Sequence, residues 1–299
     1  MYDILAIGRL TGCDIIFAGL KQMPKSGEEE FCEKFFIKAG GSANVAVAFA
    51  KLGVNTGFLT EIGKDLLGEL VYRIIIEAGV KENEIMRPEG FQTCVSAVLS
   101  IGKERGFATF ADSTRSSLTD EWIAKRIKTA PYIYTDIVHC MESSVSEIAK
   151  ENGVKLIIDT VWNTEMKIDK IKHIIKETEI FTANEVEASI ITGEDDPVKS
   201  LSILSKYAKN VVIKLGPLGC IASSEGNFIS LKAVDKFIPV DTTGAGDLFV
   251  AGMTCGYIKG WAFEKCLRFA NVTGGLAVTF YGGMDDIFNY ENVMSHFGE

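Results

Sequence analysis

A chain of 299 residues is long enough for one large α/β domain or two average domains, and 47% hydrophobic with 24% charged residues is the composition of an ordinary globular protein, which excludes a disordered or fibrous chain. The formal net charge of −9 disfavours nucleic acid as a partner, because the overall field repels a phosphate backbone. An anionic nucleotide can still bind through helix N-termini, backbone amides and a metal ion.

The seven cysteines are scattered and form no C-x-x-C pair, which argues against a disulfide framework or a zinc ribbon and favours a reducing compartment. The first eight residues lack the basic start and long apolar run of a signal peptide, and no segment approaches the length of a membrane span. We therefore expect a cytoplasmic protein that binds neither membranes nor nucleic acid.

Short apolar runs, typical of buried parallel strands, alternate along the chain with segments whose apolar residues are spaced three and four apart, as in helices. This alternation predicts a doubly wound parallel sheet with helices on both faces. The strand runs are 4–7, 133–134, 154–158 and 211–213, and the helical segments are 64–78, 119–128, 143–152, 196–209, 249–259 and 263–280.

Two regions, 14–38 and 93–111, interrupt this alternation. In the second region, residues 95–100 and 107–110 flank a glycine-containing turn and predict a β-hairpin. Extended segments that leave the main sheet without helices of their own suit a small β flap over one end of it, and exposed flap edges often pair between subunits. No repeat or Pro/Gly-rich linker in the sequence separates two independent domains.

The segment 241–247, Asp-Thr-Thr-Gly-Ala-Gly-Asp, runs directly into an apolar helical stretch. Glycines at the start of a helix leave backbone N–H groups pointing at one spot, and the helix dipole adds positive potential there, so the segment predicts an anion site that needs no lysine. Asp247 occupies the same spot. Because Asp is also a common helix N-cap, the local pattern supports capping and catalysis equally.

Residues 39–44, Ala-Gly-Gly-Ser-Ala-Asn, open another helix. Gly40 and Gly41 allow a ligand to approach the backbone, and Asn44 can both donate to and accept from hydroxyl groups. On this segment alone, a tight turn with Asn44 as the helix cap is the more common arrangement.

Two further segments follow strand-like runs. Asn184 and Glu187 are three residues apart, hence on one face of a helical turn, and such oxygen ligands suit hydrated Mg²⁺, although a solvated acidic helix start is more common. Lys214, Gly216 and Gly219 belong to a glycine-bracketed turn at a strand end, where the backbone can lie against a nucleotide.

These four segments, in this order, resemble the ribokinase-like (PfkB) family of carbohydrate and nucleoside kinases over nearly the whole chain. Gly40, Gly41 and Asn44 match the N-terminal signature of that family, and residues 241–247 match its C-terminal signature. The resemblance implies a ribokinase-like three-layer α/β/α sandwich with a small β-sheet lid. It implies a single kinase domain over 1–299, with the lid formed by about 12–38 and 92–112.

The resemblance also implies an ATP-dependent phosphotransferase that uses Mg²⁺ and phosphorylates a hydroxyl, expected to be primary, of a small sugar or sugar-like substrate. Asp247 is similar to the catalytic base of the family. The other implied roles are an anion hole of the amides of Gly244, Ala245 and Gly246; substrate binding by Asp14, Gly40, Gly41 and Asn44; nucleotide binding by Asn184, Lys214, Gly216, Gly219 and Asn271; an Mg²⁺ contact through water by Glu187; and a candidate K⁺ site at Asp241 and Thr243.

Other functions stay open at this point: a nucleoside kinase of the same fold, and a non-catalytic binding protein, against which the intact Asp247 segment argues. A dinucleotide-dependent oxidoreductase is disfavoured because no G-x-G-x-x-G fingerprint follows Gly8. The stretch 159–164 lacks the arginine that fructokinase-like members often carry there, so fructose or ketodeoxygluconate specificity does not transfer directly. The flap residues Arg105, Phe107 and Phe110 give no substrate assignment, and a homodimer through the flap is expected only from its edges.

Overall fold

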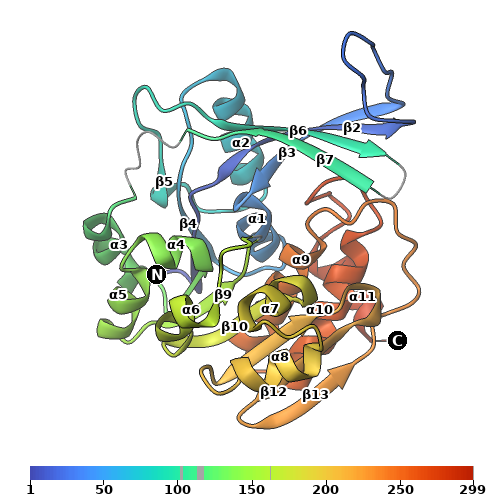
Figure 1. Ribbon diagram of the computed structural model, residues 1–299. Helices are drawn as coiled ribbons and strands as arrows, with labels where there is room; N and C mark the ends of the chain where they lie inside the picture. Colours follow the sequence, from blue (N-terminus) through green and yellow to red (C-terminus); the bar gives the residue numbers. More distant parts are fainter. Residues whose placement is uncertain (102–103, 113–117, 162, 299) are drawn as a thin grey trace.

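The computed structural model describes residues 1–101, 104–112, 118–161 and 163–298. Their main body is a nine-stranded sheet with helices on both faces, and a separate four-stranded sheet stands over one end of it (Figure 1). The predicted α/β/α sandwich with a small β-sheet lid is therefore confirmed.

The main sheet has the strand order β13-β12-β11-β10-β9-β8-β1-β4-β5. Neighbours from β11 to β5 are parallel, whereas β12 and β13 add an antiparallel edge. The bounds are β1 Ile4–Ile7, β4 Thr56–Glu61, β5 Ile85–Met86, β8 Tyr132–Asp136, β9 Lys155–Asp159, β10 Thr178–Asn184, β11 Asn210–Lys214, β12 Cys220–Ser224 and β13 Asn227–Leu231.

Alternate residues of each central strand enter different cores, as the pleat of a strand requires. Ile4 and Ala6 of β1 face one core, while Leu5 and Ile7 face the other. The first core is covered by α1 Ala43–Lys51, α2 Leu66–Glu77, α9 Ala245–Ile258, α10 Phe263–Ala277 and α11 Tyr290–Phe297. The second is covered by α3 Asp120–Arg126, α4 Ile137–Glu142, α5 Val145–Glu151, α6 Ile168–Ile175, α7 Glu185–Thr192 and α8 Pro197–Leu204.

The lid sheet is formed by the two regions, near 14–38 and 93–111, that interrupt the alternation of strands and helices in the sequence. Its order is β3-β2-β6-β7, with β2 Thr11–Leu20, β3 Lys34–Gly41, β6 Cys94–Ile101 and β7 Glu104–Phe110. The parallel pair β2–β6 links the regions, and the antiparallel pair β6–β7 confirms the predicted hairpin, whose turn at 102–103 lies outside the described residues. The lid contacts the main body through Phe36, whose ring stacks on that of Tyr281 with 5.2 Å between centroids.

Three helix boundaries differ from the prediction by three or more residues. The helix predicted at 249–259 begins at Ala245, because Gly244 adopts φ 74° and starts the helix immediately. The segments predicted to end at 209 and 280 stop as regular helix at Leu204 and Ala277, after which single turns follow, such as the bond from the Tyr207 amide to the Leu204 carbonyl.

Candidate active site

Most of the predicted site residues collect at the carboxyl ends of the parallel strands, below the lid. Asn184 and Lys214 end the neighbouring strands β10 and β11, and Asp159 ends β9 on the other side of β10. Helix α9 begins close to these strand ends: the Lys214 ammonium lies beside Gly246, which is in the first turn of α9. Open α/β sheets bind ligands at this edge.

Asp247 is the third residue of α9 rather than its cap, since the N-cap position is Gly244. The capping role that the local sequence left open is therefore wrong. Gly244 has no room for a side chain, because a Cβ there would lie 2.5 Å from the Cα of Gly283. The Asp247 carboxylate accepts a hydrogen bond at Oδ2 from Asn44 Nδ2 at 3.0 Å.

Desolvation is the main reason why the pKa of the half-buried Asp247 rises to about 6. The Asn44 hydrogen bond opposes this rise because it stabilises the charged form. The charge of Asp159 raises the pKa further, that of Lys214 lowers it and that of Asp14 raises it. A carboxylate with this pKa is ionised at neutral pH and is still basic enough to accept a proton during a reaction.

Asp14 lies on the lid strand β2, and its charge reaches Asp247. A Cβ on Gly40 would lie 2.1 Å from Asp14 Oδ2, so the glycine leaves the space that the carboxylate fills. Burial raises the pKa of Asp14 to about 6, and a hydrogen bond with Ser96 opposes the rise. The carboxylates of Asp14, on the lid, and Asp247, on the main body, are therefore near enough to interact electrostatically.

Gly41 and Asn44 form the entry to α1. Gly41 has φ 63°, and a Cβ there would lie 1.9 Å from the Leu10 carbonyl oxygen, so this turn requires glycine. The N-cap of α1 is Ser42, and the expected Asn cap is wrong. Asn44 is 5% exposed, and its Oδ1 has no hydrogen-bond partner among the described residues. Leaving this buried oxygen unpaired is costly, and a ligand hydroxyl that donates to it would remove the cost.

Asn184 and Glu187 form a capping box at the start of α7. Asn184 Oδ1 accepts from the Glu187 amide at 2.8 Å, and Glu187 Oε2 accepts from the Asn184 amide at 2.8 Å and from the Thr160 hydroxyl. Burial raises the pKa of Glu187, and the charge of Lys214 opposes the rise. No cluster of three or more His, Cys, Asp or Glu suited to a metal occurs in the described part of the chain. The side-chain oxygens of Asn184 and Glu187 are of the ligand type that suits hydrated Mg²⁺.

A buried ion pair, which the sequence alone did not indicate, crosses the strand ends. Lys214 Nζ contacts both carboxylate oxygens of Asp159, at 2.8 and 2.9 Å, and the two side chains are 13% and 7% exposed. Asp159 Oδ1 also accepts from the Thr182 hydroxyl and from the Thr160 amide. The partners are 55 positions apart in sequence, and the strand order brings them together across β10.

The predicted nucleotide-side residues surround the turn between β11 and β12. Gly216 and Gly219 both have positive φ, and a Cβ on Gly219 would lie 2.1 Å from the Leu231 carbonyl oxygen. Asn271 of α10 is 7% exposed and donates from Nδ2 to the Lys232 carbonyl at 3.2 Å. These contacts bring Asn271 to the strands that follow Gly219.

Asp241, at the start of the 241–247 loop, accepts hydrogen bonds from Thr243 and Gly282. Its Oδ1 accepts from the amide and the hydroxyl of Thr243 at 2.9 and 2.8 Å, and its Oδ2 accepts from the Gly282 amide at 2.9 Å. From the lid, Arg105 Nη1 donates to the Thr242 hydroxyl at 2.6 Å and lies 3.7 Å from Asp241 Oδ1. Arg105 thus connects the lid hairpin to this loop, a contact that the sequence did not predict.

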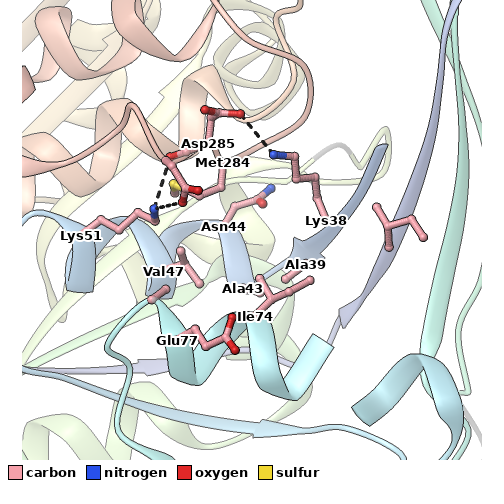
Figure 2. Close-up of a pocket in the computed structure, with 13 residues that line it drawn as sticks. Lys38, Ala39, Ala43, Asn44, Val47, Lys51, Ile74, Glu77, Met284 and Asp285 are labelled. Carbon is pink, nitrogen blue, oxygen red and sulfur yellow. Dashed lines mark hydrogen bonds and ion pairs between the residues drawn. The ribbon is translucent and has the colours of Figure 1, made fainter. Parts of the chain in front are cut away.

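A cavity of about 280 Å³ opens beside α1 (Figure 2). At its rim, Lys38 pairs with Asp285 at 3.3 Å and Lys51 pairs with Asp286 at 2.9 Å. Asn44 lines this cavity, but Asp14, Gly40 and Asp247 do not. Asn44 therefore lies between this cavity and Asp247, to which its Nδ2 donates.

A family model described as pfkB family carbohydrate kinase matches residues 1–287 of the chain. The chain belongs to this family. It is a carbohydrate kinase, an enzyme of a family that phosphorylates sugars with ATP, and the predicted family is confirmed. No helix in the described part of this kinase is long and apolar enough to cross a membrane.

Relatives of this kinase align over most of their length. The ribokinase of Haemophilus influenzae is 27% identical over 277 residues, which cover 88% of each chain. Fructokinase-1 of Oryza sativa subsp. japonica is 28% identical over 281 residues, which cover 84% of this chain and 86% of the relative. Among solved structures, the Arabidopsis thaliana ribokinase complexed with ribose and ATP superposes with a TM-score of 0.84 at 23% identity, covering 100% of this chain and 99% of that one.

Proposed function

We propose that this kinase transfers the γ-phosphate of ATP to a primary hydroxyl of a small sugar or sugar-like molecule, with Asp247 as the general base. The observation that carries this proposal is the position of Asp247. It lies in the first turn of a helix whose N-cap is Gly244, its pKa is raised to about 6, and Asn44 donates a hydrogen bond to its carboxylate. A purely structural aspartate at this place would destabilise the fold without benefit.

In the proposed reaction, the substrate hydroxyl oxygen forms a bond to the γ-phosphorus. The bond from this phosphorus to the bridging oxygen breaks, and its electron pair stays on that oxygen of ADP. Asp247 accepts the hydroxyl proton. The backbone amides of Gly244, Ala245 and Gly246 form the anion hole and donate to phosphoryl oxygens, and one such donor contributes about 3 kcal/mol to catalysis in other enzymes.

The substrate hydroxyls are assigned to Asp14, Asn44 and the backbone at Gly40 and Gly41. The unpartnered Oδ1 of Asn44 supports this assignment, as does the short separation between Gly40 and the Asp14 carboxylate. An ionised Asp14 accepts from two hydroxyl groups more favourably than it stays buried alone, because hydrogen bonds offset its desolvation.

The nucleotide is assigned to Asn184, Lys214, Gly216, Gly219 and Asn271, which follow or face the strands β10, β11 and β12. Mg²⁺, when bound with ATP, neutralises charge on the phosphates. Glu187 would contact this ion through water, since the capping box and Thr160 hold one carboxylate oxygen in place.

A potassium ion fits the side chain of Asp241 poorly. Both carboxylate oxygens already accept from Thr243 and Gly282, and the Arg105 guanidinium lies 3.7 Å from Oδ1. We therefore assign no step to a monovalent cation at Asp241 and Thr243.

We also propose one kinase domain over 1–299, with a lid of about 12–38 and 92–112 that closes on the substrate and excludes water. The contact between Phe36 and Tyr281 and that between Arg105 and Thr242 support such closure. A homodimer through the lid is supported by Phe35, which is 64% exposed on the edge strand β3. Sedimentation analysis of the wild type and Phe35→Ser tests the dimer.

ADP release from Mg-ATP, measured with pentoses, hexoses, cyclitols and nucleosides in parallel, tests the proposed reaction. We expect at least one sugar or cyclitol to stimulate ADP release with stoichiometric formation of a phosphate monoester. Stimulation by nucleosides alone would instead assign the chain to nucleoside phosphorylation, and ADP release that no compound stimulates would contradict the proposal.

A further inference from the structure

The buried pair of Lys214 and Asp159 has no evident structural purpose. Burying two charges costs several kcal/mol per ion, and well-packed apolar side chains at such sites are often as stabilising as an ion pair. The pair also lies at the strand ends, where ligands bind, rather than in either hydrophobic core. These features indicate that the charges are retained for the reaction.

The position of the lysine supports this interpretation. The nearest atom to a Cβ built on Gly246 is Lys214 Nζ, at 3.4 Å, so the ammonium lies beside the first turn of α9. The amides of this turn form the anion hole of the proposed function. The charge of Lys214 also reaches Asp247 and Glu187. A cation here would offset the repulsion between these carboxylates and an incoming phosphate.

The surroundings of Asp159 fix the direction of the lysine. Asp159 is held by the Thr182 hydroxyl and the Thr160 amide, and its two oxygens receive the ammonium. An ammonium has three N–H donors. Two are directed to Asp159, which leaves the third for an oxygen at the helix start.

We propose that Lys214 is a catalytic residue that donates a hydrogen bond to the transferred phosphoryl group at the start of α9, and that Asp159 is the positioning residue that aims it. This inference rests on the proposed kinase reaction and deepens it. Lys214 therefore contacts the phosphoryl group that is transferred, in addition to lying beside the bound nucleotide. Because the phosphoryl group gains its contacts in the transition state, the lysine contributes mainly to kcat.

The test compares Lys214→Met, Lys214→Arg, Asp159→Asn and the double variant Lys214→Met/Asp159→Asn in the ADP-release assay with the best substrate. We expect Lys214→Met to lower kcat by about 100-fold or more with a small change in the KM for ATP, as for loss of one oxyanion donor. Arginine should restore part of kcat, and Asp159→Asn should lower kcat less than Lys214→Met does. Lys150→Met, which breaks the exposed pair with Glu177, is the matched control and should keep wild-type kinetics.

The double variant separates a catalytic role from a structural one. Lys214→Met leaves Asp159 buried without its partner and should lower the melting temperature, whereas the double variant removes both charges and should recover it. We expect the double variant to remain slow although it is stable. A double variant that regains kcat together with stability would overturn the proposal. So would a Lys214→Met enzyme that changes only the KM for ATP or keeps kcat within threefold of the wild type. Absence of any sugar-dependent reaction in the wild type would instead contradict the kinase function itself.

Discussion

Replacing Asn44 with Ala removes the hydrogen bond that Nδ2 donates to Asp247 Oδ2 at 3.0 Å. A hydrogen bond to a charged group contributes about 1.5–3 kcal/mol, and one pKa unit corresponds to about 1.4 kcal/mol. Loss of the bond should therefore raise the pKa of Asp247 by about one to two units, from about 6 to about 7–8. At pH 7 the ionised fraction of the base would fall from about 90% to between about 50% and 10%.

The assay is the pH dependence of kcat/KM, which reports the pKa values of the free enzyme. A general base must be deprotonated, so activity rises with pH, and Asn44→Ala should shift this rise to higher pH. The charged groups that face Asp247 are Asp159, Lys214 and Asp14, and none of them is changed by the substitution. Asn152→Ala, which removes a bond to the Ile148 carbonyl in α5, is the control. An unshifted pH profile, whatever the drop in overall rate, would refute the reasoning.

Three further outcomes are expected. Asp247→Asn should melt at a higher temperature than the wild type at pH 8 and at the same temperature near pH 4. Because the pKa of Asp247 is raised from 3.8 to about 6, its ionised carboxylate costs about 3 kcal/mol of stability at neutral pH, and this cost vanishes as the pH falls through 6 toward 3.8. Calorimetry at several pH values measures the difference in melting temperature. Gly40→Ala should lower kcat/KM for the sugar by about 100-fold, because the added Cβ would displace the Asp14 carboxylate. Gly298→Ala is the control in the same steady-state assay and should have no effect, since no atom lies within 4 Å of a Cβ built there. Arg105→Met should raise the KM for the sugar about two- to fivefold, with little change in melting temperature, since the lid loses a partly exposed contact to the Thr242 hydroxyl.

Local sequence patterns were sufficient to predict the fold class, four strands of the main sheet and the lid hairpin. The apolar runs that became β1, β8, β9 and β11 were recognised because buried parallel strands are almost continuously apolar, and the lid hairpin was recognised from its turn. The boundaries of α9 were not, because Gly244 adopts a left-handed conformation that no neighbouring residue signals. Because the start of α9 was not predicted, the sequence could not show whether Asp247 is the helix cap or the third residue of the helix.

The contacts between the residues of the candidate site could not be predicted from sequence patterns. Asn44 and Asp247 are separated by 203 positions, and Lys214 and Asp159 by 55, with β10 between their strands. Arg105 reaches Thr242 only because the lid folds over the main sheet. Such pairs depend on strand order and lid placement, which the sequence of each segment does not contain.

The most direct measurement is the kcat of Asp247→Asn in sugar-dependent ADP release at pH 7–8, with circular dichroism to verify the fold. A positioned general base contributes about 10²- to 10⁴-fold, and the asparagine can still accept the Asn44 hydrogen bond without accepting a proton. We expect kcat to fall by at least about 100-fold in a protein at least as stable as the wild type. A folded variant that retains kcat within about threefold of the wild type would contradict the assignment of Asp247 as the base.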